Sequence, residues 1–304
     1  MDIVKLAPAI KSYIWGGTKL LSWGKPSSSD SISECWELSF NGEGPSLIAS
    51  GSDAGKELRN VASKEDLGSN VAPFPFFPVL IKLIDSASNL SIQVHPSDAY
   101  ALKNEGQYGK TEMWYIIEAE PGAGLYVGFR RQTSPEEVRK AIADGTIVDL
   151  LNFRAVKPGE TYFIASGTVH AIGKGVTLIE IQQNSTLTYR LYDYGRLGKD
   201  GKPRELHVEK ALKVLNYEPY NPPKFTLPVL GKCSYFISSL HHSEGSLEIR
   251  ASKESFLSLT FVGEEKGSFA GLPFRKGDTF FVPAGQKGLI KGKATFVQTE
   301  VPGK

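Results

Sequence analysis

The sequence predicts a mainly β protein with two related antiparallel barrels and a few short helices inserted in or following the first. Its 31 glycines and 18 prolines make up about 16% of the 304 residues, above the usual share of about 12%, which indicates many turns between short strands. Several segments have the composition of strands, and one stretch of sequence recurs at a constant offset. With 40% hydrophobic residues, the chain can build a sizeable core.

Five segments in the first two thirds of the chain have the composition of strands. One of them alternates apolar and polar residues and stops at Pro96, and the others are rich in aromatic and β-branched residues. The predicted strands cover residues 90–95, 112–117, 161–165, 176–182 and 187–192. Residues 225–304 also have the pattern of strands and turns.

Two helices are predicted between the strands. The first covers about 135–144, where Ser134 is in the position of a helix cap and Pro135 is the first helical residue. The second covers 207–216, because its apolar residues recur on one helical face. A stretch rich in proline and asparagine, 218–224, follows and is typical of a linker.

The repeated segment supports two similar structural units. Residues 157–167 resemble residues 275–285, with a turn, a glycine, an acid, a threonine, an aromatic strand and a second glycine in the same order. Both copies need tight glycine turns on either side of one strand, which favours two related antiparallel barrels. At the same offset, the counterpart of His170 is Gly288, so the copies share a scaffold but not a site. The alternative is that unrelated β structures use similar turns.

Charge and cysteine content exclude several classes of protein. The chain has 35 basic and 33 acidic residues, for a net charge of +2 without a long run of one sign, which argues against a nucleic-acid-binding protein. No apolar stretch approaches the roughly 18–20 residues that span a bilayer, and the N-terminus lacks the apolar segment of a signal peptide. Cys35 and Cys233 are too far apart for a C-x-x-C motif, and a disulfide framework is disfavoured. We therefore expect a cytoplasmic protein.

Four polar residues are candidates for a metal site. Gln93 and His95 are two residues apart in a predicted strand and share a face, Glu112 begins the next strand, and His170 follows a turn. Two histidines, a glutamate and a glutamine are ligands for a mononuclear site, and these residues alone leave zinc, copper, iron and nickel open. The alternative is that each histidine is an ordinary half-buried residue of a β protein.

Arg190 is a candidate for anion binding. It lies in 180–194, a stretch dense in polar side chains between segments that resemble core strands. Buried polar groups cost free energy unless they are satisfied, so this density favours a lined cavity. An arginine suits a bidentate contact with phosphate. The alternative is a solvated arginine on a surface strand.

Taken together and in order, five motifs resemble those of the type I phosphomannose isomerases, and most closely those of the short bacterial members. The motifs are YIWGG at 13–17, WELS at 36–39, LSIQVHP at 90–96, KTEMW at 110–114 and GTVHA at 167–171. The resemblance covers essentially the full chain. It implies a cupin fold, with a catalytic jelly-roll barrel over residues 1–220 and a second, metal-free cupin-like barrel over residues 221–304.

The resemblance also implies roles for individual residues. One zinc ion would be bound by Gln93, His95, Glu112 and His170. The substrate and its phosphate would be bound by Ser91, Lys82 and Arg190. The catalytic residues would be Arg190, Lys110 and Glu180, with Lys110 and Glu180 as rival general bases. One position departs from the family pattern: Thr186 stands where the short members usually carry aspartate, four residues before the arginine.

The implied reaction interconverts mannose 6-phosphate and fructose 6-phosphate through an enediol. Three alternatives stay open: an iron oxygenase on the same fold, since fold does not fix function, an isomerase of another phosphorylated sugar, and a non-catalytic protein that binds sugar phosphates. The lysines and the arginine favour a phosphorylated substrate. We expect the protein to be a monomer or a weak homodimer. Its binding partner would be a small sugar phosphate, and we expect it to bind neither nucleic acid nor membrane.

Overall fold

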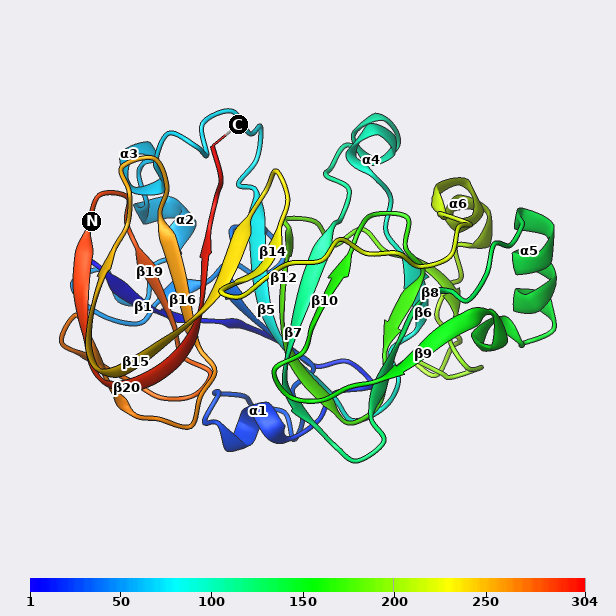
Figure 1. The fold of residues 1–304 in the computed structure, drawn as a ribbon, viewed down its shortest axis with the longest axis horizontal. Coiled ribbons are helices and arrows are strands. Elements are labelled where there is room, and N and C mark those ends of the chain that lie inside the picture. The colour runs from blue at the N-terminus through cyan, green and yellow to red at the C-terminus, as the bar shows by residue number, and fades with distance from the viewer. Residues whose placement is uncertain (199, 304) are drawn as a thin grey trace.

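The computed structural model describes residues 1–198 and 200–303, so Lys304, the last residue of the predicted second barrel, lies outside the described residues. Three sheets of antiparallel strands contain most of the regular secondary structure among these residues, which confirms the mainly β prediction. Figure 1 shows two halves, with one sheet on the left and the other two on the right. No helix among the described residues has the length and apolar character needed to cross a bilayer.

The left half of Figure 1 is a nine-stranded sheet that combines the two ends of the chain. Because β1 pairs with β19, the first strand of the chain belongs to the same sheet as the C-terminal strands. The strands are, in order, β14 (Val229–Lys232), β15 (Ile237–Arg250), β20 (Lys287–Glu300), β16 (Leu257–Phe261), β19 (Thr279–Val282), β1 (Val4–Ala7) and β4 (Leu47–Ile48). Off this order, β17 (Gly267–Phe269) pairs with β20, and β18 (Leu272–Phe274) pairs with β17. The division of the chain after residue 220 stays a prediction.

The right half contains a six-stranded and a five-stranded sheet. The six-stranded sheet has the order β10 (Thr161–Ile164), β7 (Glu112–Ala119), β12 (Val176–Gln183), β5 (Val79–Ser86), β3 (Glu34–Leu38) and β2 (Ala9–Lys11). The five-stranded sheet has the order β13 (Tyr189–Tyr192), β6 (Ile92–Val94), β11 (His170–Ile172), β8 (Gly124–Phe129) and β9 (Leu151–Ala155). The five strands predicted in this half all form, and the largest differences are two residues: β6 and β13 begin two residues later than predicted, and β7 ends two residues later.

The helices are short and lie around the sheets. They are α1 (Lys19–Ser22), α2 (Leu58–Val61), α3 (Lys64–Leu67), α4 (Asp98–Asn104), α5 (Pro135–Ala143), α6 (Val208–Val214) and the 3-10 helix η1 (Ile147–Leu150). The two predicted helices are confirmed as α5 and α6. Ser134 caps α5 by accepting a hydrogen bond from the backbone N–H of Glu137. The predicted linker at 218–224 contains neither a helix nor a strand.

The repeated segment has the same local structure in both copies. β10 and β19 begin and end at matching positions of the repeat. The glycines before them, Gly159 and Gly277, have φ of 91° and 86°, and those after them, Gly167 and Gly285, have φ of 87° and 77°. Glycine adopts this left-handed backbone without the steric cost that other residues bear, which explains why it recurs.

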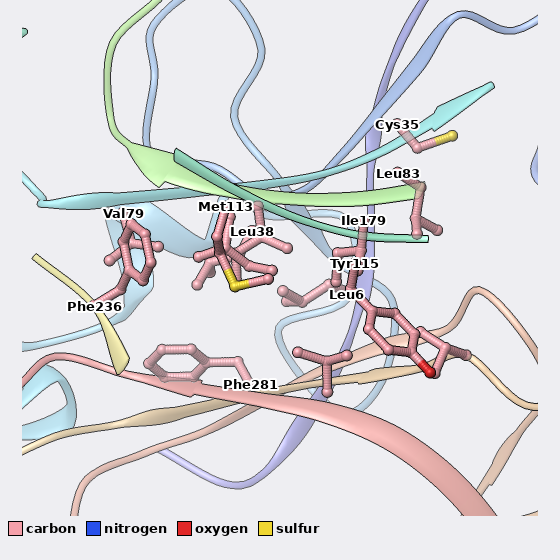
Figure 2. Packing of buried hydrophobic residues seen from close by; sticks show 14 of the residues in the cluster. Leu6, Cys35, Leu38, Val79, Leu83, Met113, Tyr115, Ile179, Phe236 and Phe281 are labelled. Atoms are coloured by element: carbon pink, nitrogen blue, oxygen red, sulfur yellow. The ribbon is translucent and has the colours of Figure 1, made fainter. Parts of the chain in front are cut away.

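Apolar layers fill the spaces between the sheets. Figure 2 shows the layer between the six-stranded and nine-stranded sheets, where Leu83, Met113 and Ile179 face Leu6 and Phe281. A second layer lies between the six-stranded and five-stranded sheets, and a third lies between the five-stranded sheet and helices α5 and α6. The six-stranded sheet is therefore covered on both faces.

Candidate active site

Alternation along the six-stranded sheet separates an apolar face from a polar one. In the middle of β5, β7 and β12, the odd-numbered apolar residues lie in the layer against the nine-stranded sheet, so the even-numbered residues between them point to the opposite face. The residues of that layer are Val79, Ile81, Leu83, Met113, Tyr115, Ile117, Ile179 and Ile181. That face carries Lys82, Glu112, Trp114 and Glu180. The strand register places Glu180 opposite Lys82 on one side and opposite Trp114 on the other.

The five-stranded sheet contributes the facing residues. Its residues Ile92 and Leu191 pack toward the helices, which turns Gln93, His170 and Arg190 toward the six-stranded sheet. Gln93 is opposite His170 on β11 and opposite Arg190 on β13. The candidate ligands Gln93, Glu112 and His170 therefore come from two sheets that face each other, and His95 directly follows β6.

His95, Glu112 and His170 form a buried group that could hold a metal ion. Their ligand-type atoms all lie within 4.8 Å of one another. His170 Nε2 is 3.4 Å from Glu112 Oε1, and His95 Nε2 is 3.8 Å from Glu112 Oε2. On the other side of each ring, Nδ1 is 2.8 Å from a backbone carbonyl, that of Leu187 for His95 and that of Thr168 for His170. A ring whose Nδ1–H donates to a carbonyl presents an unprotonated Nε2, as metal-binding histidines do.

The electrostatics of this group also fit a cation. Burial lowers the pKa of His170 to about 4 and, together with Lys110, lowers the pKa of His95 well below its usual value. Both rings are therefore neutral near pH 7, the form that binds metals. Burial, reinforced by Glu180, raises the pKa of Glu112. Glu112 Oε1 is buried without a hydrogen-bond donor among the described residues, and a divalent cation would satisfy it.

Gln93 completes the set of predicted ligands. Its Nε2 lies 3.4 Å from His170 Nε2. The two ends of a side-chain amide have the same shape, so rotation of the group by half a turn presents Oε1 to the same point. Gln93 is therefore within reach of the cluster, and the structure brings all four predicted ligands together.

Two lysines and two glutamates form a charged network beside the group of His95, Glu112 and His170, called the metal-type group below. Lys82 Nζ lies 3.3 Å from both Glu34 and Glu180. Lys110 Nζ lies 2.5 Å from Glu112 and 3.4 Å from Glu180. Burial alone would raise the pKa of Glu180, but Lys110 and Lys82 outweigh it and lower that pKa. Trp114 Nε1 also donates a hydrogen bond of 2.9 Å to Glu180, which therefore stays ionised at neutral pH.

A cavity of about 350 Å³ opens beside this network. All the residues predicted for catalysis and substrate binding line it, namely Lys82, Ser91, Lys110, Glu180 and Arg190. His95, Glu112 and His170 do not belong to the lining, but Gln93 and Lys110 both line the cavity and contact this group. Thr186 lies in the cavity wall as well, so its replacement of the usual aspartate removes a carboxylate from the lining.

Several lining residues were not among the predicted site residues. They are Tyr13, Trp15, Glu34, Trp36, Glu43, Ile84, Leu90, Ile172, Thr188 and Arg204. Trp15 and Trp36 lie in motifs noted above. Glu34 shares the face of Trp36, and its carboxylate accepts a hydrogen bond of 2.6 Å from Trp36 Nε1. Alternation along that strand could have identified Glu34. Arg204 lies in a loop, where no periodicity indicates which way a side chain points.

Comparisons with known proteins agree on one family. Residues 3–116 match the family model described as the catalytic domain of type I phosphomannose isomerase. The chain is 36% identical over 292 residues to mannose-6-phosphate isomerase ManA of Bacillus subtilis (strain 168), covering 91% of this chain and 92% of that protein. It is also 36% identical over 283 residues to mannose-6-phosphate isomerase of Streptococcus mutans, covering 89% of each.

The fold agrees with the sequence comparisons. The crystal structure of the mannose 6-phosphate isomerase from Bacillus subtilis superposes with a TM-score of 0.86 at 35% identity, covering 98% of this chain and 99% of that one. A putative mannosephosphate isomerase from Archaeoglobus fulgidus has the same fold, with a TM-score of 0.80 at 24% identity and 97% of each chain covered. The chain belongs to the type I phosphomannose isomerase family.

Proposed function

We propose that this chain is a metal-dependent aldose–ketose isomerase that interconverts mannose 6-phosphate and fructose 6-phosphate. The observation that carries the proposal is the buried group of His95, Glu112 and His170, next to a cavity lined by lysines and arginines. The names of the relatives support the same reaction, because the chain covers about nine tenths of each of the two quoted. A phosphorylated sugar is an anion, which suits the cationic lining.

We propose zinc as the metal, with His95, Glu112, His170 and Gln93 as its ligands. Imidazole nitrogens and one carboxylate are ligands that zinc takes in catalytic sites. When bound, zinc supplies a Lewis acid that polarises the sugar carbonyl and stabilises negative charge on the neighbouring oxygens. The neutral Gln93 leaves Glu112 as the one anionic ligand in this set, so the site would retain a net positive charge.

The proton transfer is assigned to the pair formed by Lys110 and Glu180. In the forward direction, a base removes the proton from C2 of the aldose to give the enediolate, the proton of the C2 hydroxyl passes to the oxygen on C1, and the proton taken from C2 is returned to C1 to give the ketose. Lys110 and Glu180 both line the cavity and lie 3.4 Å apart, so a proton taken by one can be shared with the other. The two residues stay joint candidates for the base.

Substrate binding is assigned to Ser91, Lys82 and Arg190. Arg190 carries a guanidinium that can contact phosphate through two N–H groups. Lys82 already contacts two carboxylates, so we assign it to the sugar oxygens near the reacting carbons. Contacts with the remote phosphate orient the reacting carbons and so contribute to rate.

We further propose that the fold consists of two cupin-type jelly-roll barrels. The facing six-stranded and five-stranded sheets would form the catalytic barrel, and the nine-stranded sheet would form the second, metal-free one. The matching bounds of β10 and β19 support this proposal. So does the group of His95, Glu112 and His170, which lies entirely in the first of these regions.

A coupled assay for fructose 6-phosphate formed from mannose 6-phosphate tests the proposed function. We expect turnover by the purified protein, loss of turnover after chelation, and recovery when zinc is restored. Absence of turnover in every metal state would contradict an isomerase of this sugar. If mannose 6-phosphate then still raised the melting temperature, a non-catalytic sugar-phosphate-binding protein would be the better account.

A further inference from the structure

The two ends of the cavity differ in charge. Near the metal-type group, Lys82 and Lys110 face the carboxylates of Glu34, Glu112 and Glu180, so their positive charge is matched. The other end is lined by two arginines, Arg190 and Arg204. The carboxylates that act on Arg190 are the buried Asp193 and the exposed Glu205, and a third arginine, Arg196, also contacts Asp193. The remaining lining carboxylate, Glu43, acts on Tyr13 together with Glu34 and Lys82. This arginine end therefore carries an excess of positive charge and suits an anion.

Asp193 holds Arg204 in place at this end. Asp193 directly follows β13, and its side chain is 5% exposed. Its two carboxylate oxygens accept hydrogen bonds of 2.8 Å and 2.5 Å from Nε and Nη2 of Arg204, and one of them also accepts 2.6 Å from Arg196. A fork of two parallel bonds fixes the plane of a guanidinium. The third nitrogen of Arg204, Nη1, has no hydrogen-bond partner among the described residues.

The loop brings Arg204 back to the site from a distance in sequence. Leu197 and Pro203 form a β-bridge, and the N–H of Gly198 donates a hydrogen bond of 2.7 Å to the carbonyl of Lys202. This closed turn brings Arg204, eleven residues after Asp193, back beside the end of β13. The position of Arg204 is thus fixed by backbone pairing as well as by its ion pair.

Arg190 offers a second incompletely paired group. Its Nη1 donates a hydrogen bond of 2.7 Å to the carbonyl of Glu205, but its Nε is buried without a partner in the described part of the chain. Burial, and next the neighbouring Arg204, lower the pKa of Arg190. An anion that contacts both guanidinium groups would satisfy the free N–H groups and offset the repulsion between the two arginines.

We propose that Arg204 contacts the phosphate of the substrate directly and that Asp193 is its positioning residue. This inference rests on the proposed function. It places the phosphate at the arginine end, between Arg204 and Arg190, and directs C1 and C2 of the sugar toward Lys110 and the metal-type group. Arg204 thereby sets the specificity for a phosphorylated over a free sugar.

Substitution of Arg204 tests the contact. We expect Arg204→Met to raise KM for mannose 6-phosphate about tenfold or more, as expected for the loss of a charge-assisted hydrogen bond, with kcat changed by less than about threefold. The inhibition constant of inorganic phosphate should rise by a similar factor. Arg204→Lys should recover part of both effects because it restores the charge without the fork. The control is Arg154→Met, which removes an exposed arginine of β9 outside this cavity.

Each outcome separates this inference from the proposed function. If the wild type turns over mannose 6-phosphate and Arg204→Met keeps the wild-type KM and phosphate inhibition, the contact is wrong and the function stands. A fall in kcat and in melting temperature at unchanged KM would assign Arg204 a structural role and overturn the inference. If the wild type shows no turnover, stabilisation by inorganic phosphate is measured instead. Its loss in Arg204→Met but not in Arg154→Met would support the anion site, and equal stabilisation of both variants would refute it.

Discussion

The two copies of the repeated segment have the same backbone conformation, but one borders polar side chains and the other borders aromatic ones. In the first copy, β10 pairs with β7, and Ile164 lies opposite the candidate ligand Glu112. In the second copy, β19 carries Phe280, whose ring packs edge-on against those of Phe261 and Phe269. One copy thus borders a buried polar site, and the other is part of an aromatic core.

The first region is the pair of facing six-stranded and five-stranded sheets, and the second is the nine-stranded sheet. The surroundings of Gly288, the counterpart of His170, show why the described residues of the second region hold no group like that of His95, Glu112 and His170. A Cβ added to Gly288 would lie 2.8 Å from Ile3 Cδ1 and 2.8 Å from the Phe269 ring. That distance is shorter than an ordinary carbon–carbon contact, so no side chain fits there without displacing its neighbours. Packed rings in this region occupy the space that the first region uses for histidines and a cavity.

The aromatic region is expected to contribute mainly to stability, and the polar region mainly to catalysis. A fully buried phenylalanine contributes about 1.5–3 kcal/mol through removal of its surface from water. Buried charges such as Glu112 and Lys110 contribute little, because their desolvation cancels much of their attraction. We therefore expect substitutions in the two regions to have separable effects on activity and on the free energy of unfolding.

The largest expected effect is on activity in the first region. His95→Ala should lose bound metal and reduce kcat/KM by roughly a thousandfold or more, because the variant loses both a ligand and the Lewis acid. His241→Ala, which changes a histidine of β15 in the other region, is the control and should keep both. Metal content by mass spectrometry and the coupled assay measure the two properties. Full activity of His95→Ala after chelation would contradict the metal site.

A substitution in the aromatic core should lower stability and leave activity unchanged. Phe261→Ala should lower the free energy of unfolding by about 3–5 kcal/mol, since it removes a buried ring and leaves a cavity. Its metal content and its kcat below the melting transition should stay at the wild-type level. Denaturant unfolding and the coupled assay check both. Loss of metal in this variant would show that the two regions are not separable.

Arg190→Ala separates substrate binding from metal binding within the first region. We expect it to retain the metal, because Arg190 contacts none of the three ligands His95, Glu112 and His170 in the described structure. Its kcat/KM should fall about a hundredfold through loss of a charged contact with the substrate. Equal loss of metal and activity would instead indicate that Arg190 supports the ligand set.

The smallest effect is expected from adding a histidine to the second region. Gly288→His should lower the free energy of unfolding by about 1–3 kcal/mol, because the side chain overlaps Ile3 and Phe269. It should not change the amount of metal bound per chain, since a single histidine among apolar rings offers no further ligand. Thermal unfolding and metal analysis test this. Binding of an additional metal ion would contradict the account of the aromatic core.

Local sequence patterns predicted much of the fold but not its long-range pairings. Alternation and the capping residues predicted β7, β12 and α5 to within a few residues, because these features depend on neighbours in sequence. The pairing of β1 with β19 could not be read from either segment, since any two strands of suitable composition can pair. The membership of β1 in the C-terminal sheet was therefore found only in the structure.

The candidate site divides in the same way. The His95, Glu112 and His170 group was predicted from motifs, and the structure brings these residues together. Alternation along β3 would have placed Glu34 on the face of Trp36, but its contact with Lys82 depends on the register between β3 and β5. Arg204 was missed because a closed loop, rather than a strand, carries it to the cavity. Strand register and loop closure themselves leave no periodic signal in the sequence, so the contacts that depend on them could not be predicted.

We propose that one metal ion, bound in the first region alone, is required for turnover. Titration of chelator-treated protein with zinc, with bound metal and isomerase activity measured on the same samples, tests it most directly. We expect activity to rise in proportion to bound zinc and to reach its maximum at about one ion per chain. Full activity without bound metal, or a maximum reached only at two ions per chain, would contradict the claim.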